Sequence, residues 1–272
     1  MKARVLTGIF GGGALLAYLL FLPPIFTVSL MTPVCVLAMY EILAVTNIVS
    51  HRGLTAAAML FAAVVPFFRV ETGLWFPAAA LFVYTAVLGC IQVKYHATLK
   101  AEQTGFVFFV STVIPLSLSC LGYLRLQGEH GLFYVLLALI MPWFADIGAY
   151  FVGTLCGKHK LCPNISPKKT VEGLIGGVVV SVGVTLLAAW VYVRFFAHEA
   201  VVCWWQLAVL SLVCAPLSVL GDLFASIIKR QSGAKDYGHL IPGHGGVMDR
   251  FDSLIFTAPV LYLVVLACPF IR

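Results

Sequence analysis

The stretch that decides the fold class is residues 173–193, GLIGGVVVSVGVTLLAAWVYV, which contains no charged side chain. An α-helix rises ~1.5 Å per residue, so ~20 apolar residues cross the ~30 Å hydrocarbon core of a bilayer. Eight more stretches of this character lie at 5–22, 25–46, 54–69, 74–93, 105–123, 132–155, 203–228 and 253–271. The sequence therefore predicts an all-α, polytopic integral membrane protein with about nine transmembrane helices.

The composition excludes a soluble domain of this size. Hydrophobic residues make up 61% of the chain, charged residues only 10%, and the mean hydropathy is +1.02. A soluble surface needs more charge than this. We expect one integral membrane domain over residues 1–272, with N-terminal helices in 1–130 and the polar motifs in 131–272. The third span is short and contains Pro66, so eight or ten crossings remain open.

The aspartates gather in two short polar stretches of this apolar chain. One stretch holds a single aspartate, and the other holds the remaining four: Asp146; Asp222, Asp236, Asp249 and Asp252. An ionised side chain is expensive inside a bilayer and is usually functional there. The two stretches are therefore the candidate site.

Lysine and arginine predict the orientation of the chain. With nine spans, the loops on the N-terminal side carry 13 of these residues and the loops on the other side carry 4. Positive charge collects on the cytoplasmic side of membrane proteins. The N-terminus and both polar stretches are thus expected at the cytoplasmic face of a cell (inner) membrane, although the bias depends largely on the polar stretches themselves.

The first polar stretch, residues 142–173, combines the aspartate Asp146 with four lysines. Asp146 lies about 14 residues into its span, ~21 Å along a helix, and must face protein or a water-filled cavity. Ser166 and Pro167 have the pattern of an N-cap followed by a first helical residue, which predicts Lys168 and Lys169 in a first helical turn. Such a start is a plausible anion site; the alternative is that the lysines only contact anionic headgroups.

The second polar stretch, residues 221–253, begins on a helix. Asp222, Ser226 and Lys229 are spaced i, i+4, i+7, which places them on one helical face. Asp249 and Asp252 are spaced i, i+3 at the start of the last span, so both carboxylates are expected to point the same way. Two helix ends would then converge on one pocket.

These residue types suit a metal and a phosphate. Aspartate oxygens are hard ligands of the kind that magnesium prefers, and magnesium usually takes only one or two carboxylates. The glycine-rich run 242–246 lets backbone N–H groups approach an anion, and nearby bases can neutralise a transferring phosphoryl group. The pattern indicates metal-assisted phosphoryl or nucleotidyl transfer. Taken singly, each residue could instead be a helix-end charge, a membrane-edge anchor or part of an ordinary turn.

The same residues resemble a known family. The run from Ser226 through Lys229 and Arg230, Lys235 and Asp236, to 242–252 is similar to the motif of phosphatidate cytidylyltransferases, also called CDP-diacylglycerol synthases. Residues 166–173 resemble that family's other cytoplasmic segment, whereas residues 1–130 resemble it mainly in hydropathy. At Ala225 many members carry a glutamate, so a role assigned to that glutamate would be absent here.

The resemblance implies transfer of CMP from CTP to phosphatidic acid, giving CDP-diacylglycerol and pyrophosphate for phospholipid biosynthesis. The implied cofactor is Mg²⁺, with a second cation left open. The implied partners are CTP, phosphatidic acid and the bilayer, with no nucleic acid; a homodimer is compatible with the sequence. The implied catalytic residues are Asp222, Lys229, Lys235, His244, Asp249, Arg250 and Asp252. The implied substrate-binding residues are Ser166, Lys168, Lys169, Ser226, Arg230, Gly245 and Gly246. The implied metal ligands are Asp146, Asp222, Asp249 and Asp252.

Two other functions are also compatible with these residues. A CTP-dependent kinase or cytidylyltransferase acting on a polyprenyl or ether lipid would use similar groups, and an ion or phosphate transporter would also place acids and bases in membrane cavities. The transporter's usual mark, two related halves with interrupted helices, is not seen. Glu41, deep in the second span, is expected to be a satisfied buried acid, and most of the scattered cysteines are expected to be small buried hydrophobes.

Overall fold

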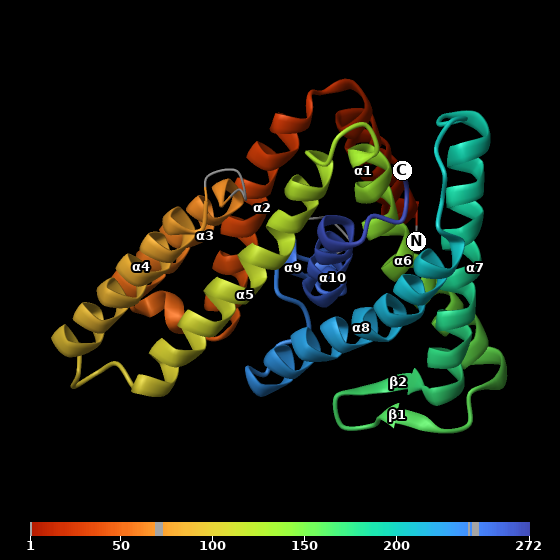
Figure 1. Ribbon diagram of the computed structural model, residues 1–272. Helices are drawn as coiled ribbons and strands as arrows, with labels where there is room; N and C mark the ends of the chain where they lie inside the picture. The colour runs from red at the N-terminus through yellow and green to blue at the C-terminus, as the bar shows by residue number, and fades with distance from the viewer. Residues whose placement is uncertain (1, 69–72, 239, 241–244) are drawn as a thin grey trace. The chain divides into compact units, whose positions relative to one another are not determined.

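The computed structural model describes residues 2–68, 73–238, 240 and 245–272, with the backbone alone for residues 2–11. Almost all of the secondary structure in this part of the chain is helical (Figure 1). Six of the described helices are long and apolar enough to cross a membrane. The predicted all-α, polytopic fold class is therefore confirmed.

The chain divides into two compact units. Unit 1 contains Met1–Tyr123 and Gln231–Phe251, and unit 2 contains Leu124–Arg230 and Asp252–Arg272. The elements of unit 1 are α1 (Lys2–Phe21), α2 (Pro24–Val45), η1 (Ile48–Ser50), α3 (Arg52–Val64), η2 (Val65–Phe67), α4 (Trp75–Lys94), α5 (Ala101–Arg125, to Tyr123) and α9 (Met248–Phe251). The elements of unit 2 are α6 (Gly131–Cys156), β1 (Lys160–Cys162), β2 (Ser166–Thr170), α7 (Val171–Phe195), α8 (Trp204–Gln231, to Arg230) and α10 (Leu254–Ala267).

Each of the nine predicted spans coincides with a helix or a helical pair. The six long helices are α2, α4, α5, α6, α7 and α8. Three shorter apolar segments, Gly12–Phe21, Arg52–Phe67 and Leu254–Ala267, occupy the other three predicted spans. The number of crossings stays a prediction, as does the single-domain organisation.

Polar groups in the apolar part of unit 1 satisfy one another. The Tyr84 hydroxyl of α4 lies 2.6 Å from Ser111 Oγ of α5, and the Tyr123 hydroxyl of α5 donates to the Val65 carbonyl at 2.6 Å. The Tyr84 ring also stacks on Phe61 of α3, with ring centroids 4.1 Å apart. These contacts join α3, α4 and α5, which is necessary because lipid offers no hydrogen-bond partner.

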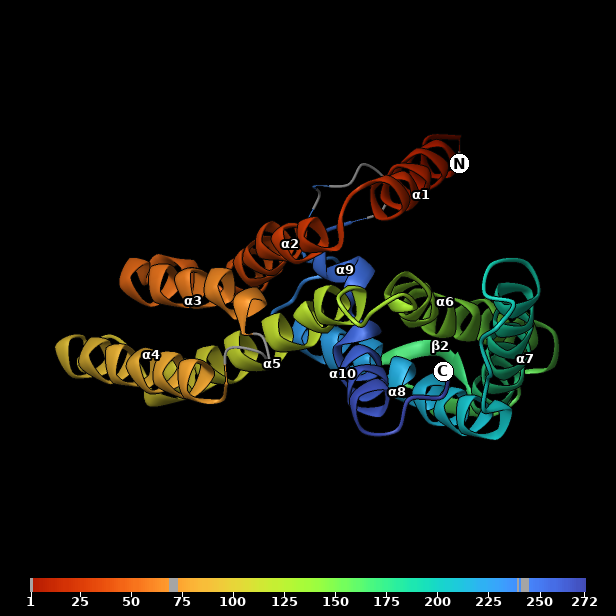
Figure 2. The ribbon, with the colours of Figure 1, turned by 45° about the horizontal axis from the view of Figure 1, so that its top comes forward.

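Small residues bring α6 and α7 into close contact in unit 2, where the two helices run side by side (Figure 1, Figure 2). A Cβ on Gly173 would lie 2.7 Å from the Ala149 carbonyl oxygen, and one on Gly148 would lie 2.7 Å from Val180. Glycine at such positions lets helix backbones approach, as is common between membrane helices. The approach sets the position of the polar residues on α6 relative to the start of α7.

The predicted helix start at Ser166 is wrong. Residues 166–170 form strand β2, which pairs antiparallel with β1, and the helix begins at Val171. Thr170 is its N-cap, because the Thr170 hydroxyl accepts a hydrogen bond from the Gly173 N–H at 3.1 Å. The Thr170 cap satisfies one free amide of the first turn, so the helix starts after Thr170 and not after Ser166. Lys168 and Lys169 therefore lie on a hairpin that leads into α7.

Candidate active site in unit 2 and the 245–249 segment of unit 1

A cavity of about 160 Å³ lies in unit 2 where the hairpin meets α6 and α7. Asp146 and Tyr150 of α6 line it, together with Lys168 and Lys169 of β2. The remaining lining residues are Ala149, Leu161, Thr170, Gly173, Leu174 and Val219. The expectation that Asp146 faces a cavity is thus confirmed, and the cavity has both an acid and two bases in its wall.

An ion pair joins the hairpin to α8. The Lys169 ammonium nitrogen lies 2.7 Å from Asp222 Oδ2, and the Ser226 hydroxyl donates to Asp222 Oδ1 at 3.3 Å. The second contact confirms the predicted i, i+4 face of α8. Lys169 Nζ is enclosed from solvent and has no further hydrogen-bond partner among the described residues. An ammonium group has three N–H donors, so donors remain for an anionic oxygen.

A second acid and base lie close to this pair. Asp252 is half-buried and interacts electrostatically with Asp222, Lys229 and Asp146, while Lys229 itself is only 8% exposed. Burial, and after it the negative charge of Asp222, raises the pKa of the Asp252 carboxyl to about 7. Lys229 opposes that rise. Asp146 also interacts with Lys169 and Asp222, so these five residues form one electrostatic cluster, here called the acid–lysine cluster.

The charges of the acid–lysine cluster suit a bound cation. Three carboxyl groups lie among two ammonium groups, so the cluster carries an excess of one negative charge when every group is ionised. Within the described part of the chain, no group of three or more acid, histidine or cysteine side chains is assembled closely enough to hold a metal. Magnesium, however, commonly uses one or two carboxylates and takes its other ligands from water and substrate phosphates. The donor set of Asp222 and Asp252 fits this ion.

Glu41 organises the glycine-rich segment in unit 1. Its carboxylate accepts hydrogen bonds from the backbone N–H of Val247 at 2.9 Å and of Met248 at 2.8 Å. Gly238 and Gly246 pack against the same side chain, and a Cβ on Gly246 would overlap the carboxylate. The expectation of a satisfied buried acid is therefore confirmed, and its partner is the segment that precedes Asp249.

Asp249 folds the same segment. Its Oδ2 accepts from the Tyr237 N–H at 2.8 Å and from the Gly246 N–H at 3.0 Å. Gly245 has φ +83°, and a Cβ there would lie 2.8 Å from Oδ2 of Asp249, so this turn requires glycine. Asp249 thus has a role in loop structure, and its assignment as a metal ligand stays a prediction.

Asp249 and Asp252 do not begin one helix, contrary to the prediction. Helix α9 ends at Phe251 and α10 begins at Leu254, so Asp252 lies between them. The Ser253 N–H donates to Asp252 Oδ1 at 2.8 Å. Aspartate bonded to a neighbouring backbone group in this way competes with helical hydrogen bonding, which explains the interruption.

The other predicted site residues are placed as follows. Ser166 is partly exposed, Gly246 is buried, and the charged members of the group are exposed: Lys168, Arg230, Lys235, Asp236 and Arg250. His244 lies outside the described residues. Their roles stay predictions from the sequence.

One residue that supports the hairpin was not singled out from the sequence. Glu172, in the first turn of α7, accepts from the backbone N–H of Lys158 at 3.1 Å and of His159 at 3.2 Å, and lies 2.6 Å from His159 Nδ1. These contacts tie the two ends of the hairpin together. The available signal was an acid two residues after the threonine cap, where the helix dipole favours it.

Together, the fold and the acid–lysine cluster define a class: a polytopic membrane protein in which acids and lysines gather beside a cavity. The chain belongs to the cytidylyltransferase family, whose family model matches residues 2–268.

The similarity to individual relatives also extends over nearly the whole chain. A protein named phosphatidate cytidylyltransferase from Bacillus subtilis (strain 168) is 33% identical over 270 residues, covering 97% of both chains. Proteins of the same name from Staphylococcus saprophyticus and Staphylococcus aureus (strain COL) are each 33% identical, over 277 and 276 residues, covering 98% of this chain and 99% of theirs. The family resemblance of the motifs is thereby confirmed, and it includes the N-terminal half.

Proposed function

We propose that this protein is a phosphatidate cytidylyltransferase, which transfers CMP from CTP to phosphatidic acid and forms CDP-diacylglycerol and pyrophosphate. The observation that carries the proposal is the acid–lysine cluster, in which the enclosed Lys169 ammonium pairs with Asp222 beside a cavity. This cluster lies in a chain that belongs to the cytidylyltransferase family. The full-length relatives that carry this name support the choice of substrates.

In the proposed reaction, an oxygen of the phosphatidic acid phosphomonoester attacks the α-phosphorus of CTP. The new P–O bond forms as the bond from the α-phosphorus to the bridging oxygen of pyrophosphate breaks, and pyrophosphate leaves with that electron pair. A phosphomonoester already carries one to two negative charges at neutral pH. The protein therefore needs no strong base, and its main tasks are to neutralise charge and to align two anions.

Lys169 is the first residue assigned to this task. Its free N–H donors can bind a phosphate oxygen while Asp222 holds the side chain in place. Lys229, almost completely buried, offsets the charge of Asp252 and can do the same for substrate. Removing one such donor from a phosphate site commonly costs ~10²–10³-fold in turnover.

Asp222 and Asp252 are the residues that would hold magnesium, with Asp249 and Asp146 as further ligands proposed from the sequence. Bound magnesium supplies Lewis-acid neutralisation of the reacting phosphates. We assign Lys235, Arg250 and His244 to the triphosphate and the leaving pyrophosphate. Ser166, Lys168, Ser226, Arg230, Gly245 and Gly246 complete the proposed substrate-binding set.

The proposed location is the cytoplasmic (inner) membrane of the cell, with the hairpin and the 231–253 segment facing the cytoplasm. The excess of lysine and arginine on that side supports the orientation. CTP and magnesium are cytoplasmic reagents, so the proposed chemistry requires the same side.

The test is product analysis with the purified full-length protein. Incubation with CTP labelled in the α-phosphate and phosphatidic acid is expected to move the label into CDP-lipid, with release of pyrophosphate, only when magnesium is present. Phosphorylated lipid together with CDP would instead support a CTP-dependent kinase. Label transfer to a polyprenyl or ether lipid phosphate but not to phosphatidic acid would also contradict the proposal.

A further inference from the structure

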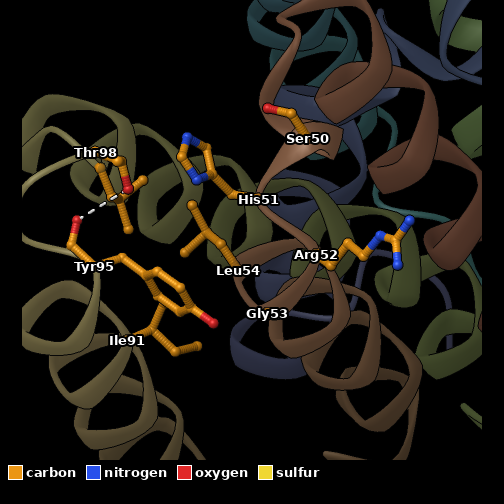
Figure 3. A pocket seen from close by; sticks show the side chains of 9 residues that line it. Ser50, His51, Arg52, Gly53, Leu54, Ile91, Tyr95 and Thr98 are labelled. Carbon is orange, nitrogen blue, oxygen red and sulfur yellow. Dashed lines mark hydrogen bonds between the residues drawn. The ribbon is translucent and has the colours of Figure 1, made fainter.

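A second hollow, far along the sequence from the acid–lysine cluster, lies within unit 1. It has a volume of about 300 Å³ and is bounded by two connections, the turn from α2 to α3 and the end of α4 with the loop to α5 (Figure 3). Its lining residues are Ser50, His51, Arg52, Gly53, Leu54, Ile91, Tyr95, Thr98 and Leu99. None of them belongs to the proposed catalytic or substrate-binding set.

Polar side chains at this hollow have spare hydrogen-bonding capacity. In Figure 3, the His51 ring and the Tyr95 side chain lie about the hollow, whereas the Arg52 guanidinium extends from its edge. The Thr98 hydroxyl donates to the Tyr95 carbonyl at 3.4 Å. By contrast, the His51 ring, the Arg52 guanidinium and the Tyr95 hydroxyl have no hydrogen-bond partner within the described ranges of the chain.

The charge around this hollow is positive. Lys94 Nζ lies 5.3 Å from the centroid of the Tyr95 ring, so a lysine joins Arg52 and His51 beside the hollow. Among the described residues that line it, none is acidic. A phosphate group is the chemical match, because it accepts hydrogen bonds and is attracted to each base.

An apolar groove begins at the same place. It has a volume of about 360 Å³ and is lined by residues of α4, namely Phe82, Val83, Ala86, Val87, Cys90, Ile91 and Lys94. These positions recur every three or four residues and so share one helical face. The groove shares Ile91 with the polar hollow and includes Lys94. The polar and apolar hollows are therefore neighbours.

The length of the groove fits one lipid chain. From Phe82 to Lys94 a helix rises ~18 Å, and one leaflet of the ~30 Å hydrocarbon core is ~15 Å thick. Other parts of the chain leave much of this α4 face exposed, since Phe82 is 76% and Val83 is 59% exposed. A phosphate with an acyl chain attached would thus meet bases at one end and apolar side chains along its length.

We propose that this composite site, defined by His51, Arg52, Tyr95 and the α4 groove from Phe82 to Lys94, binds one anionic phospholipid. The shape and charge of the two hollows select for a phosphate headgroup without a compensating cation. A choline headgroup would bring positive charge to Lys94 and Arg52, and free phosphate would leave the groove empty. Both connections belong to the loops that the count of lysine and arginine assigns to the cytoplasmic side of the membrane, where anionic lipids are expected.

Native mass spectrometry of the full-length protein in mild detergent tests the headgroup contact. The probes are phosphatidylglycerol and phosphatidylcholine with identical acyl chains. The wild-type protein is expected to retain phosphatidylglycerol more strongly, and Lys94→Gln is expected to reduce that retention about fivefold, the effect of one base near a membrane surface. Lys100→Gln is the matched control, because Lys100 is an exposed base of the same connection that lines neither hollow. Equal retention of the two lipids, or equal effects of the two substitutions, overturns the proposal.

A second pair of variants tests the groove. Val87→Trp fills it, whereas Val93→Trp places the same side chain on α4 outside it, at a residue that is 74% exposed. Lipid retention is expected to fall several-fold in the first variant only, while CMP transfer in zwitterionic micelles stays unchanged in both. Equal retention by the two variants contradicts the groove. If Val87→Trp converts a two-copy assembly to single chains, the face is an interface between copies and the proposal is wrong.

Inorganic phosphate separates the lipid from a free anion. Excess inorganic phosphate alone is expected to leave the bound phosphatidylglycerol in place, because it cannot occupy the groove. Complete displacement of the lipid by inorganic phosphate would assign the hollow to a soluble phosphate compound and would overturn the lipid assignment. These outcomes do not depend on CMP transfer, so a failure here leaves the proposed function standing.

Discussion

Replacing Glu41 with glutamine is expected to release the Gly246–Met248 backbone from α2. Glu41 is 6% exposed and accepts two backbone hydrogen bonds, from Val247 at 2.9 Å and from Met248 at 2.8 Å. Glutamine keeps one acceptor oxygen and turns an NH₂ group toward the other backbone N–H. One buried amide then has no acceptor, and the surviving bond has a neutral acceptor.

The cost follows from these two losses. A hydrogen bond to a charged group contributes ~1.5–3 kcal/mol and a neutral one ~1 kcal/mol. Losing one charged bond and weakening the other therefore costs on the order of 2–4 kcal/mol. If this cost falls on local opening of the segment, the open population rises roughly 30- to 700-fold, because each 1.4 kcal/mol is about tenfold.

Amide hydrogen exchange measures this opening directly. Exchange at Val247 and Met248 is expected to accelerate by that factor in Glu41→Gln, with the amides of α2 unchanged. CMP transfer is expected to fall about tenfold or more, since the segment carries Asp249 and Arg250. Glu102→Gln, at an exposed glutamate in the first turn of α5, is the matched control. Unchanged exchange at Val247 and Met248, or equal acceleration throughout unit 1, would refute the anchoring role.

Three further predictions test the remaining contacts. Lys169→Gln is expected to lower kcat/KM for CMP transfer by ~10²–10³-fold. Lys160→Gln, at an exposed residue of strand β1, should change kcat/KM less than about twofold. Similar losses in both variants would refute the special role of Lys169. Gly246→Ala is expected to destabilise the protein by ~1–3 kcal/mol, because the added methyl group overlaps Glu41. Gly105→Ala, where the added methyl group meets open space, should stabilise α5 by ~0.5–1 kcal/mol. Thermal unfolding in detergent distinguishes the two variants, and equal shifts of their unfolding temperatures would contradict the packing of Gly246 against Glu41. The pKa of Asp252 is raised to about 7, so the stability that the protonated carboxyl contributes to the metal-free protein is lost as the pH rises through 7. The magnesium affinity measured by calorimetry should increase over the same pH interval. A pH-independent affinity, or the same pH dependence in Asp252→Asn, would show that Asp252 is not a ligand.

Helical spacing predicted a contact correctly within one helix, but local rules failed to predict where two helices begin. The spacing of Asp222 and Ser226 predicted a shared helical face, and the two side chains are bonded. The start of α7 and the interruption at Asp252 were predicted wrongly, because two local signals competed in each place. Thr170 accepts the cap hydrogen bond from Gly173, whereas Ser166 lies in strand β2. Asp252 bonds to the next backbone N–H instead of continuing a helix.

The sequence by itself determined the membrane class, the approximate positions of the helices and the family motif, because bilayer thickness sets a length that any apolar run must meet. Only the tertiary structure decided which groups meet. Lys169 pairs with Asp222, and Glu41 binds a backbone amide 206 residues further along the chain. The partners in each pair lie in different segments, so helical periodicity does not relate their positions. Such contacts arise because a buried charge or amide must find a partner somewhere in the fold, and helical spacing cannot say where.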